Sequence, residues 1–163
     1  MVNSSQSDPI HRILCPIDFS PTSEKAFAYA TRIARHSGGT IVLFHAFDVP
    51  DSWSAGGRID EVDQELKNKL LSISADSADL KIERVAHGGP AGPVICWVAQ
   101  EQKCDLMVIG THGRLGISHL LLGSVAEYCV RHAPCPVLTV RNRSDAELPL
   151  EEPEFYIPMP PVM

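Results

Sequence analysis

Several features that would assign a chain to a familiar class are missing from this sequence. No apolar run approaches the ~20 residues that a membrane helix needs, and no basic cluster is longer than Arg141-Asn142-Arg143. The formal net charge is -6, so no nucleic-acid partner is expected. The opening residues, MVNSSQSDPI, carry neither the basic nor the apolar segment of a secretory signal. We therefore expect a cytoplasmic protein that does not enter a membrane.

Paired cysteines are also lacking. The five cysteines, at 15, 96, 104, 129 and 135, include no C-x-x-C pair, which is typical of reduced thiols in the cytosol. One spacing leaves zinc open as an alternative, because Cys129, His132 and Cys135 form C-x2-H-x2-C and both residue types bind zinc. A helix here would turn these three residues to different faces, and no fourth ligand is evident. Buried thiols are the preferred interpretation.

The length predicts one domain with appendages. At 163 residues, a chain buries about two thirds of its unfolded surface, so neither a metal nor a disulfide is needed for folding. We expect a flexible N-terminus over residues 1–9, a domain over residues 10–141 and a tail over residues 142–163.

What the sequence does contain is an alternation of two patterns. Five short segments are rich in β-branched residues, as strands are, and four of them are almost continuously apolar, which is typical of strands buried on both faces of a parallel sheet. The exception, LKIERVAH, alternates and is predicted to lie at a sheet edge. The five are RILCPI (12–17), TIVLFHAF (40–47), LKIERVAH (80–87), DLMVIG (105–110) and PVLTVR (136–141).

Four helical patterns lie around these strands. The first is predicted to start at Ser20 as N-cap with Pro21 following, and to stop at Gly38-Gly39. The apolar positions that mark the helices are Ala26, Phe27, Ala30, Ile33 and Ala34; Val62, Leu66, Leu70 and Ile73; Val94, Ile95, Val98 and Ala99; and Val125, Tyr128 and Cys129. Repeated strand–helix–strand units predict an α/β fold with a parallel sheet and helices on both faces.

Two segments fall outside this alternation. Residues 49–60, VPDSWSAGGRID, are predicted to form a mobile loop. The tail, residues 142–163, has five prolines and five acidic residues, which exclude a regular helix or an inner strand. Its apolar side chains leave two interpretations open, a disordered tail or a docking arm; they are Phe155, Tyr156, Ile157, Met159 and Val162.

Glycine is concentrated after the fourth predicted strand, in the stretch IGTHGRLGISHLLLGSV. Gly110 and Gly113 are expected to turn the backbone with positive φ and to approach a ligand closely. Ser124 and Val125 are expected to begin the next helix, whose free N–H groups and dipole favour an anion such as a phosphate chain. Because ligands of open α/β sheets bind at the carboxyl ends of strands, this loop is a candidate site.

Two familiar phosphate loops are excluded by spacing. A P-loop has a lysine before its Ser or Thr, whereas Gly123 precedes Ser124 here. The dinucleotide fingerprint is G-x-G-x-x-G after the first strand, whereas this chain has G-x-x-G-x-x-G after the fourth.

The pattern Gly110-x2-Gly113-x9-Gly123-Ser124 instead resembles the ATP-binding signature of the universal stress protein family. The likeness extends over residues 10–141 and includes PIDFS (16–20), LFHAF (43–47), GGPAGPVI (88–95) and CPVLTVR (135–141). The resemblance implies an open, doubly wound, five-stranded parallel sheet in the order 3-2-1-4-5, a Rossmann-like three-layer sandwich of the adenine nucleotide alpha hydrolase-like type. It also implies a homodimer through the last strand, Val137, Leu138, Thr139 and Val140, which would cover an otherwise exposed apolar edge.

The resemblance also assigns site residues. Asp18 is suited to ribose hydroxyls or to a magnesium ion bridging phosphates, and equally to capping a turn. His112 and Arg114 either contact phosphate oxygens or remain solvated. The residues assigned to the adenine and ribose end are Pro16, Asp18 and Ala46, and those assigned to the ribose and phosphates are Ile109, Gly110, Gly113, Gly123, Ser124 and Val125.

The resulting expectation is an ATP-binding regulatory module of the stress response, with slow hydrolysis at most. Phosphoryl transfer needs a positioned nucleophile and charge stabilisation, and the loop supplies one arginine and one histidine without a P-loop lysine. A weak ATPase or nucleotidyl-transfer enzyme, and a dimeric interaction module that binds no nucleotide, remain alternatives. The phosphate-binding pattern alone does not select ATP over other adenine nucleotides, and an unknown protein partner is compatible with each function.

Overall fold

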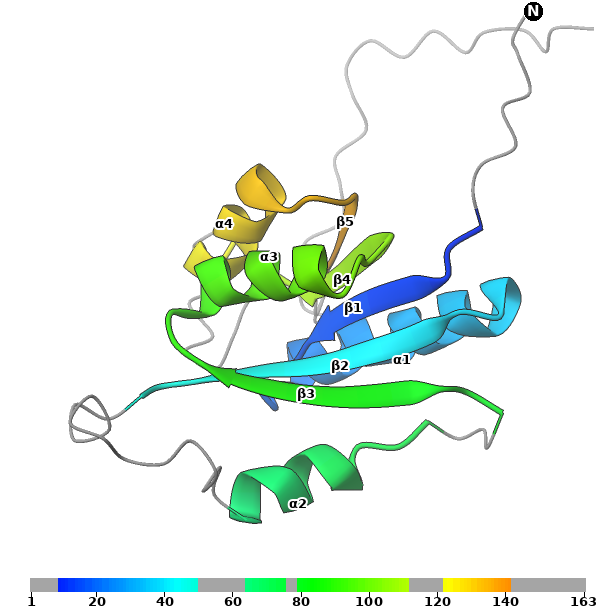
Figure 1. Ribbon diagram of the computed structural model, residues 1–163, viewed down its shortest axis with the longest axis horizontal. Coiled ribbons are helices and arrows are strands. Elements are labelled where there is room, and N and C mark those ends of the chain that lie inside the picture. Colours follow the sequence, from blue (N-terminus) through cyan, green and yellow to red (C-terminus); the bar gives the residue numbers. More distant parts are fainter. Residues whose placement is uncertain (1–8, 50–63, 76–78, 112–121, 142–163) are drawn as a thin grey trace, which may run out of the picture.

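The computed structural model describes residues 9–49, 64–75, 79–111 and 122–141. Strands and helices alternate along the chain in these parts, as the two sequence patterns predicted (Figure 1). The elements are β1 (Arg12–Pro16), α1 (Pro21–Ser37), β2 (Thr40–Phe47), α2 (Gln64–Ser72), β3 (Ile82–Gly88), α3 (Ala91–Glu101), β4 (Leu106–Gly110), α4 (Ser124–His132) and β5 (Val137–Val140).

The five strands form one parallel sheet in the order β3-β2-β1-β4-β5, which confirms the predicted topology. The register pairs Ile13 with Ile41 of β2 and with Leu106 of β4, so β1 lies at the centre. The alternating segment LKIERVAH contributes β3, an edge strand, as its pattern predicted.

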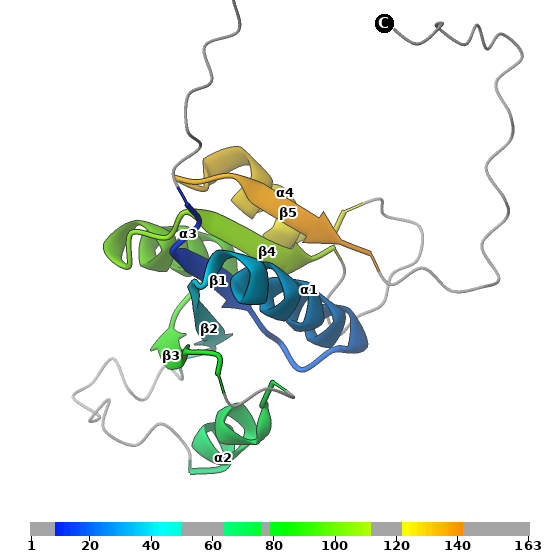
Figure 2. The same cartoon turned by 90° about the vertical axis from the view of Figure 1, so that its right-hand side faces the viewer.

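Helices cover both faces of the sheet and create two separate cores (Figure 2). On one face, α1 and α2 pack against side chains such as Ile13 and Val108. On the other face, α3 and α4 pack against Leu14 and Met107. Successive residues of a strand point to opposite faces, so one continuous apolar strand supplies both cores. This is the physical reason that the inner strands read as unbroken apolar runs.

Helix α1 begins and ends where local sequence signals predicted. The Ser20 side chain accepts a hydrogen bond from the Ser23 N–H over 3.3 Å, and Pro21 is the first helical residue. Gly38 ends the helix with φ of 70°, in the left-handed region where glycine is favoured. Ile33, predicted to point inward, is only half-buried.

Some predictions fall outside the described residues. These are most of the expected loop over residues 49–60, the expected helical position Val62 and the tail over residues 142–163. Within the described residues, no helix is both long and apolar enough to cross a membrane.

Candidate functional site

At the carboxyl ends of β1 and β4, the connections that follow the two strands lead to opposite faces of the sheet. After β1 the chain enters α1 on one face, and after β4 it reaches α4 on the other. Strands β1 and β4 are hydrogen-bonded neighbours, so Asp18 and Thr111 follow adjacent strands at one edge. Such a divergence of connections is where open α/β sheets bind ligands.

The N-terminus of α4 is fixed at this edge by backbone hydrogen bonds. The Gly123 N–H donates to the Thr111 carbonyl oxygen over 2.6 Å, and the Thr111 N–H donates to the Val140 carbonyl oxygen over 2.9 Å. Gly123 is the N-cap of α4, and no side-chain hydrogen bond caps the helix within the described residues. Because the first amides of a helix have no intrahelical acceptor, those of Ser124 and Val125 lack a helical partner, and their predicted contact with a phosphate stays a prediction.

The N-terminus of α1, at the same edge, is satisfied differently. Asp18 Oδ1 accepts hydrogen bonds from the Ser20 N–H, over 3.0 Å, and from the Ser20 hydroxyl. The Ser20 Oγ in turn accepts from the Ser23 N–H. The turn-capping role predicted for Asp18 is therefore confirmed. The N-terminus of α1 is thus already capped by side chains of the chain itself. The N-terminus of α4 has no such cap, so it is the better candidate to receive an anion.

Phe19 and His45 were missed by sequence reasoning. Phe19 has φ of 63°, a left-handed conformation that is costly for an aromatic residue and often occurs at functional sites. Its ring packs against that of His45, with 4.8 Å between centroids. His45 is 6% exposed, and its Nδ1 lies 2.6 Å from the Ile17 carbonyl oxygen. The available signal was a single ionisable residue inside the apolar segment TIVLFHAF.

Three of the apolar residues assigned to the nucleotide site, two to the adenine and ribose end and Ile109 to the ribose and phosphates, come from adjacent strands. Ile109 is buried in the core under α3 and α4, and Ala46 packs against the same core. Pro16 is two residues beyond Leu14 of that core, so the pleat places it on the same face. The structure thus brings Pro16, Ala46 and Ile109 to the face that also carries α4.

The prediction of positive φ for Gly110 is wrong. Among the described glycines only Gly38 and Gly89 have positive φ, and Gly110 is the last residue of β4. Glycine is favoured there by a close approach: an added Cβ would lie 3.0 Å from Thr22 Cγ2 and 3.2 Å from the Ser23 nitrogen, which is tighter than ordinary contact. Gly110 therefore lets the first turn of α1 pack against the end of β4.

The middle of the glycine-rich signature lies outside the described residues. His112, Gly113 and Arg114 belong to this part, so their predicted contacts with phosphate stay predictions.

The C-x2-H-x2-C residues do not converge. Cys129 is fully buried, and burial raises the pKa of its thiol to about 12. His132 is exposed and stacks on Tyr128, with 4.1 Å between ring centroids. In the described part of the chain, no three His, Cys, Asp or Glu side chains are placed to bind a metal ion.

The last strand has an exposed outer edge. β5 pairs with β4 alone within the described sheet. Leu138 is 38% exposed and Thr139 is also exposed, whereas Val140 is buried in the core under α1. Four residues of β5 were predicted to form a dimer interface. Val140 packs in the core of its own subunit, and Val137 is half-buried. Leu138 and Thr139 are therefore the two with exposed side chains.

Comparison with known proteins supports the resemblance seen in the sequence. A sequence model of the universal stress protein family matches residues 9–141. Universal stress protein MJ0531 of Methanocaldococcus jannaschii is 32% identical over 143 residues, covering 80% of this chain and 82% of that protein. Universal stress protein MJ0577 of the same organism is 26% identical over 155 residues, covering 82% of this chain and 96% of that protein.

Solved structures share the fold. The structure of MJ0577 has a TM-score of 0.63 at 26% identity, covering 84% of this chain and 99% of that one. A universal stress protein in complex with cAMP has a TM-score of 0.63 at 23% identity, covering 81% and 97% of the two chains. A family protein from Arabidopsis thaliana with AMP bound has a TM-score of 0.52 at 20% identity, covering 83% and 94%. The chain belongs to the universal stress protein family.

Proposed function

We propose that this protein binds an adenine nucleotide at the carboxyl ends of β1 and β4 and acts as a nucleotide-dependent regulatory module in the stress response. The observation that carries the proposal is the α4 N-terminus. Gly123 provides no capping side chain, and its hydrogen bond to Thr111 holds the helix beside the end of β4. Amides and the helix dipole at this point attract a phosphate group.

The surrounding residues fit the rest of such a ligand. Ala46, which is half-buried, offers apolar surface for an adenine ring or the carbon side of a ribose, and the buried Pro16 and Ile109 lie on the same face of the neighbouring strands. Relatives with cAMP and AMP bound share the fold, which supports an adenine nucleotide as the ligand class. ATP is our preferred ligand, because the Gly123-Ser124 signature resembles the ATP-binding type of the family.

Asp18 is proposed to hold ribose hydroxyls or a magnesium ion that accompanies the phosphates. Its Oδ1 accepts two hydrogen bonds from Ser20, which fix the carboxylate at the edge of the sheet. Carboxylate oxygen is a ligand that magnesium prefers. A bound magnesium ion would neutralise phosphate charge there, while Asp18 orients it.

Slow or absent hydrolysis follows from the residues available. The position that is lysine in a P-loop is Gly123, so the charge stabilisation that this lysine gives to phosphoryl transfer is missing. Binding without turnover suits regulation, because a ligand shifts a conformational equilibrium by its difference in affinity for the two states. We propose a dimer through β5 as the assembly on which the nucleotide acts.

The decisive experiment measures nucleotide binding to the full chain. Isothermal calorimetry with ATP, ADP, AMP and cAMP, each with and without magnesium, should give saturable binding for at least one of them. Mass spectrometry of small molecules released from the purified protein should identify an adenine nucleotide. Ser124→Pro is the informative variant, because it removes one amide while proline is tolerated in the first helical position. Its affinity should fall, whereas Ser124→Ala, which keeps the amide, should bind as the wild type does.

The alternatives give different results. Steady-state turnover well above about one per minute, abolished by Asp18→Ala, would favour an ATPase or a nucleotidyl-transfer enzyme. No binding of any adenine nucleotide, together with no nucleotide released on denaturation, would contradict the proposal and favour a dimeric interaction module.

A further inference from the structure

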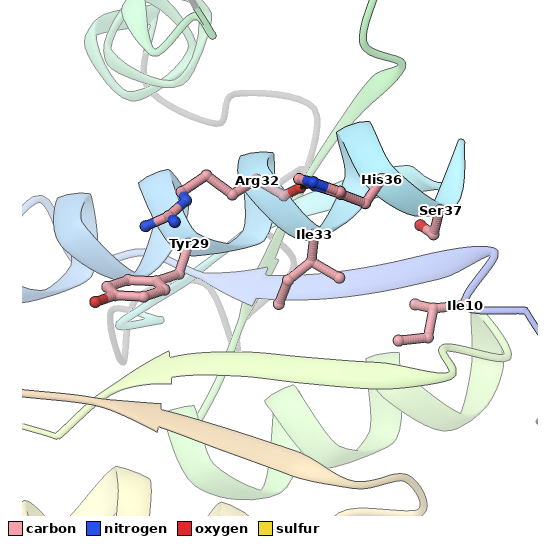
Figure 3. A pocket seen from close by; sticks show the side chains of 6 residues that line it. All are labelled: Ile10, Tyr29, Arg32, Ile33, His36 and Ser37. Atoms are coloured by element: carbon pink, nitrogen blue, oxygen red, sulfur yellow. Dashed lines mark hydrogen bonds between the residues drawn. The ribbon is translucent and has the colours of Figure 1, made fainter.

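A groove between the C-terminal half of α1 and the segment before β1 is separate from the proposed nucleotide site. It has a volume of about 470 Å³, within the range of pockets that hold small ligands or side-chain anchors. Figure 3 shows that its side chains come from one side of α1 and from the segment before β1. The lining residues are Ile10, Tyr29, Arg32, Ile33, His36 and Ser37.

The groove combines an apolar floor with a basic rim. Tyr29 is 40% exposed, and Ile10 and Ile33 are half-buried. The Arg32 guanidinium lies over the Tyr29 ring, 5.6 Å from its centroid. Among the described residues no carboxylate pairs with Arg32. Such a surface fits a segment that is both apolar and acidic.

The tail of this chain has that composition. Residues 151–163 read EEPEFYIPMPPVM, in which three glutamates precede a run of aromatic, aliphatic and proline residues. The family match ends at residue 141, so the fold of the domain does not account for this segment. Proline-rich peptides dock in grooves lined by aromatic side chains, because their extended conformation is already restricted.

We propose that residues 151–163 dock within the same subunit in this groove on α1. Phe155, Tyr156 and Ile157 fill the apolar floor beside Tyr29, and the preceding glutamates lie near Arg32. This proposal does not depend on nucleotide binding.

The length of the chain permits this docking. α1 contacts β5, so the tail starts from a strand beside the helix. The 15 residues from Val140 to Phe155 can span up to ~50 Å, whereas a helix of 17 residues is only ~25 Å long. The segment can therefore reach any part of α1 from the end of β5.

The charge of the groove favours docking of the tail over a contact between the grooves of two copies. Two copies in a symmetric contact present the same surface to each other, so a groove-to-groove dimer would bring Arg32 of one copy near Arg32 of the other. The tail instead places carboxylates against the guanidinium group of Arg32. Opposite charges at a rim guide the register of a segment even where each pair is weak.

The test is a photo-cross-link in the full chain. p-Benzoylphenylalanine in place of Tyr156 keeps an aromatic side chain and captures what lies beside it on illumination. Mass spectrometry should find the cross-link in the peptide that contains residues 29–37, and the product should run as a single chain on a denaturing gel.

Charge-reversal variants test the ion pairing. Arg32→Glu should lower the cross-linked fraction roughly threefold to fivefold, as expected for a partly exposed charge pair. Arg35→Glu is the matched control, because Arg35 is exposed on the same helix but does not line the groove, and it should have a smaller effect. Glu151→Arg, Glu152→Arg and Glu154→Arg together should restore cross-linking in the Arg32→Glu chain. Circular dichroism and urea denaturation report whether each variant is folded.

Three results would overturn the proposal. Cross-links that join only two copies would assign the groove to a neighbouring subunit. Cross-links confined to segments other than residues 10 and 29–37, or an equal yield from wild type and Arg32→Glu, would show that the tail does not use this groove.

Discussion

The Gly123 N–H donates to the Thr111 carbonyl oxygen over 2.6 Å, which ties the N-cap of α4 to the residue after β4. The two residues are twelve positions apart in sequence, and residues 112–121 lie between them outside the described residues. The consequence is that the N-terminal amides of α4 lie at the carboxyl edge of the sheet. The proposed phosphate site depends on this contact.

Gly110→Ala should destabilise the fold. The new Cβ would lie 3.0 Å from Thr22 Cγ2 and 3.1 Å from the Thr22 carbonyl carbon, so the first turn of α1 must shift. We expect a loss of about 1–3 kcal/mol in the free energy of unfolding, as for other overpacked sites. Urea denaturation measures this loss, and calorimetry should show weaker nucleotide binding.

Gly38→Ala is the matched control for Gly110→Ala. Gly38 has φ of 70° and no atom within 4 Å of its added Cβ, so the cost is conformational and amounts to about 1–2 kcal/mol. Nucleotide affinity should be unchanged because Gly38 lies at the opposite end of α1. Equal effects of both variants on affinity would contradict a specific role for packing at Gly110.

Asp18→Asn and Ser20→Ala should separate ligand binding from helix capping. Asparagine keeps the oxygen that accepts from Ser20, so the turn should persist while affinity for the magnesium nucleotide falls about tenfold, as for a lost hydrogen bond to a charged group. Ser20→Ala removes the N-cap of α1 and should cost about 1 kcal/mol of stability. Calorimetry and urea denaturation on both variants give the comparison. An Asp18→Asn protein with wild-type affinity would remove Asp18 from the proposed site.

Thr139→Pro should disrupt the proposed dimer and leave the subunit folded. The carbonyl oxygens of Pro136 and Val140 accept from Met107 and Thr111, so the alternate residue Thr139 directs its N–H to the free edge. Proline removes only this outward donor, which edge strands tolerate. Sedimentation velocity should show a dimer for the wild type and for Thr139→Val, and a monomer for Thr139→Pro. A dimer in all three would place the interface elsewhere.

Glu83→Gln should reduce the loss of unfolding free energy that occurs as the pH falls into the acid range. Arg12 donates to both carboxylate oxygens, over 3.2 and 2.7 Å, and this hydrogen bonding lowers the pKa of Glu83 below its ordinary value of 4.5. A lowered pKa in the folded state stabilises the protein above pH 4.5, and this contribution disappears as the pH falls through the folded value. The pair is partly exposed, so the contribution is at most about 1 kcal/mol.

The measurement for Glu83→Gln is urea denaturation at several pH values. The wild type should be the more stable protein near neutral pH, and the difference should close below pH 4.5. A difference that stays constant down to strongly acid pH would show that the substitution acts through packing instead of through charge.

Local sequence signals predicted the elements because each signal acts within a few residues. Ser20-Pro21 and Gly38 set the two ends of α1, and the continuous apolar runs of β1, β2 and β4 required burial on both faces of a sheet. Alternation in LKIERVAH placed β3 at an edge for the same reason. The glycine-serine signature located the end of β4 and the start of α4, since Gly110 is the last residue of β4 and Gly123 is the N-cap of α4.

Other features depended on contacts between distant segments. No residue near Gly110 in the sequence indicates that Thr22 lies against it. The prediction therefore explained Gly110 by a positive φ, whereas the structure shows a close approach to α1. Phe19, which is left-handed, packs its ring against His45, a residue 26 positions further along the chain. Ile33 satisfies the helical pattern of a core residue and packs against the core under α1, yet it stays half-buried and also lines the groove.

The sequence by itself determined which residues form strands, where α1 starts and stops, and where α4 begins, because neighbouring residues settle those properties. Only the tertiary structure decided that Asp18, Thr111 and Gly123 share one edge, and that Tyr29 and Ile33 form a surface with a basic rim. These placements arise when the sheet closes in the order β3-β2-β1-β4-β5 and packs helices on both faces, which brings together residues whose separation along the chain hides their proximity.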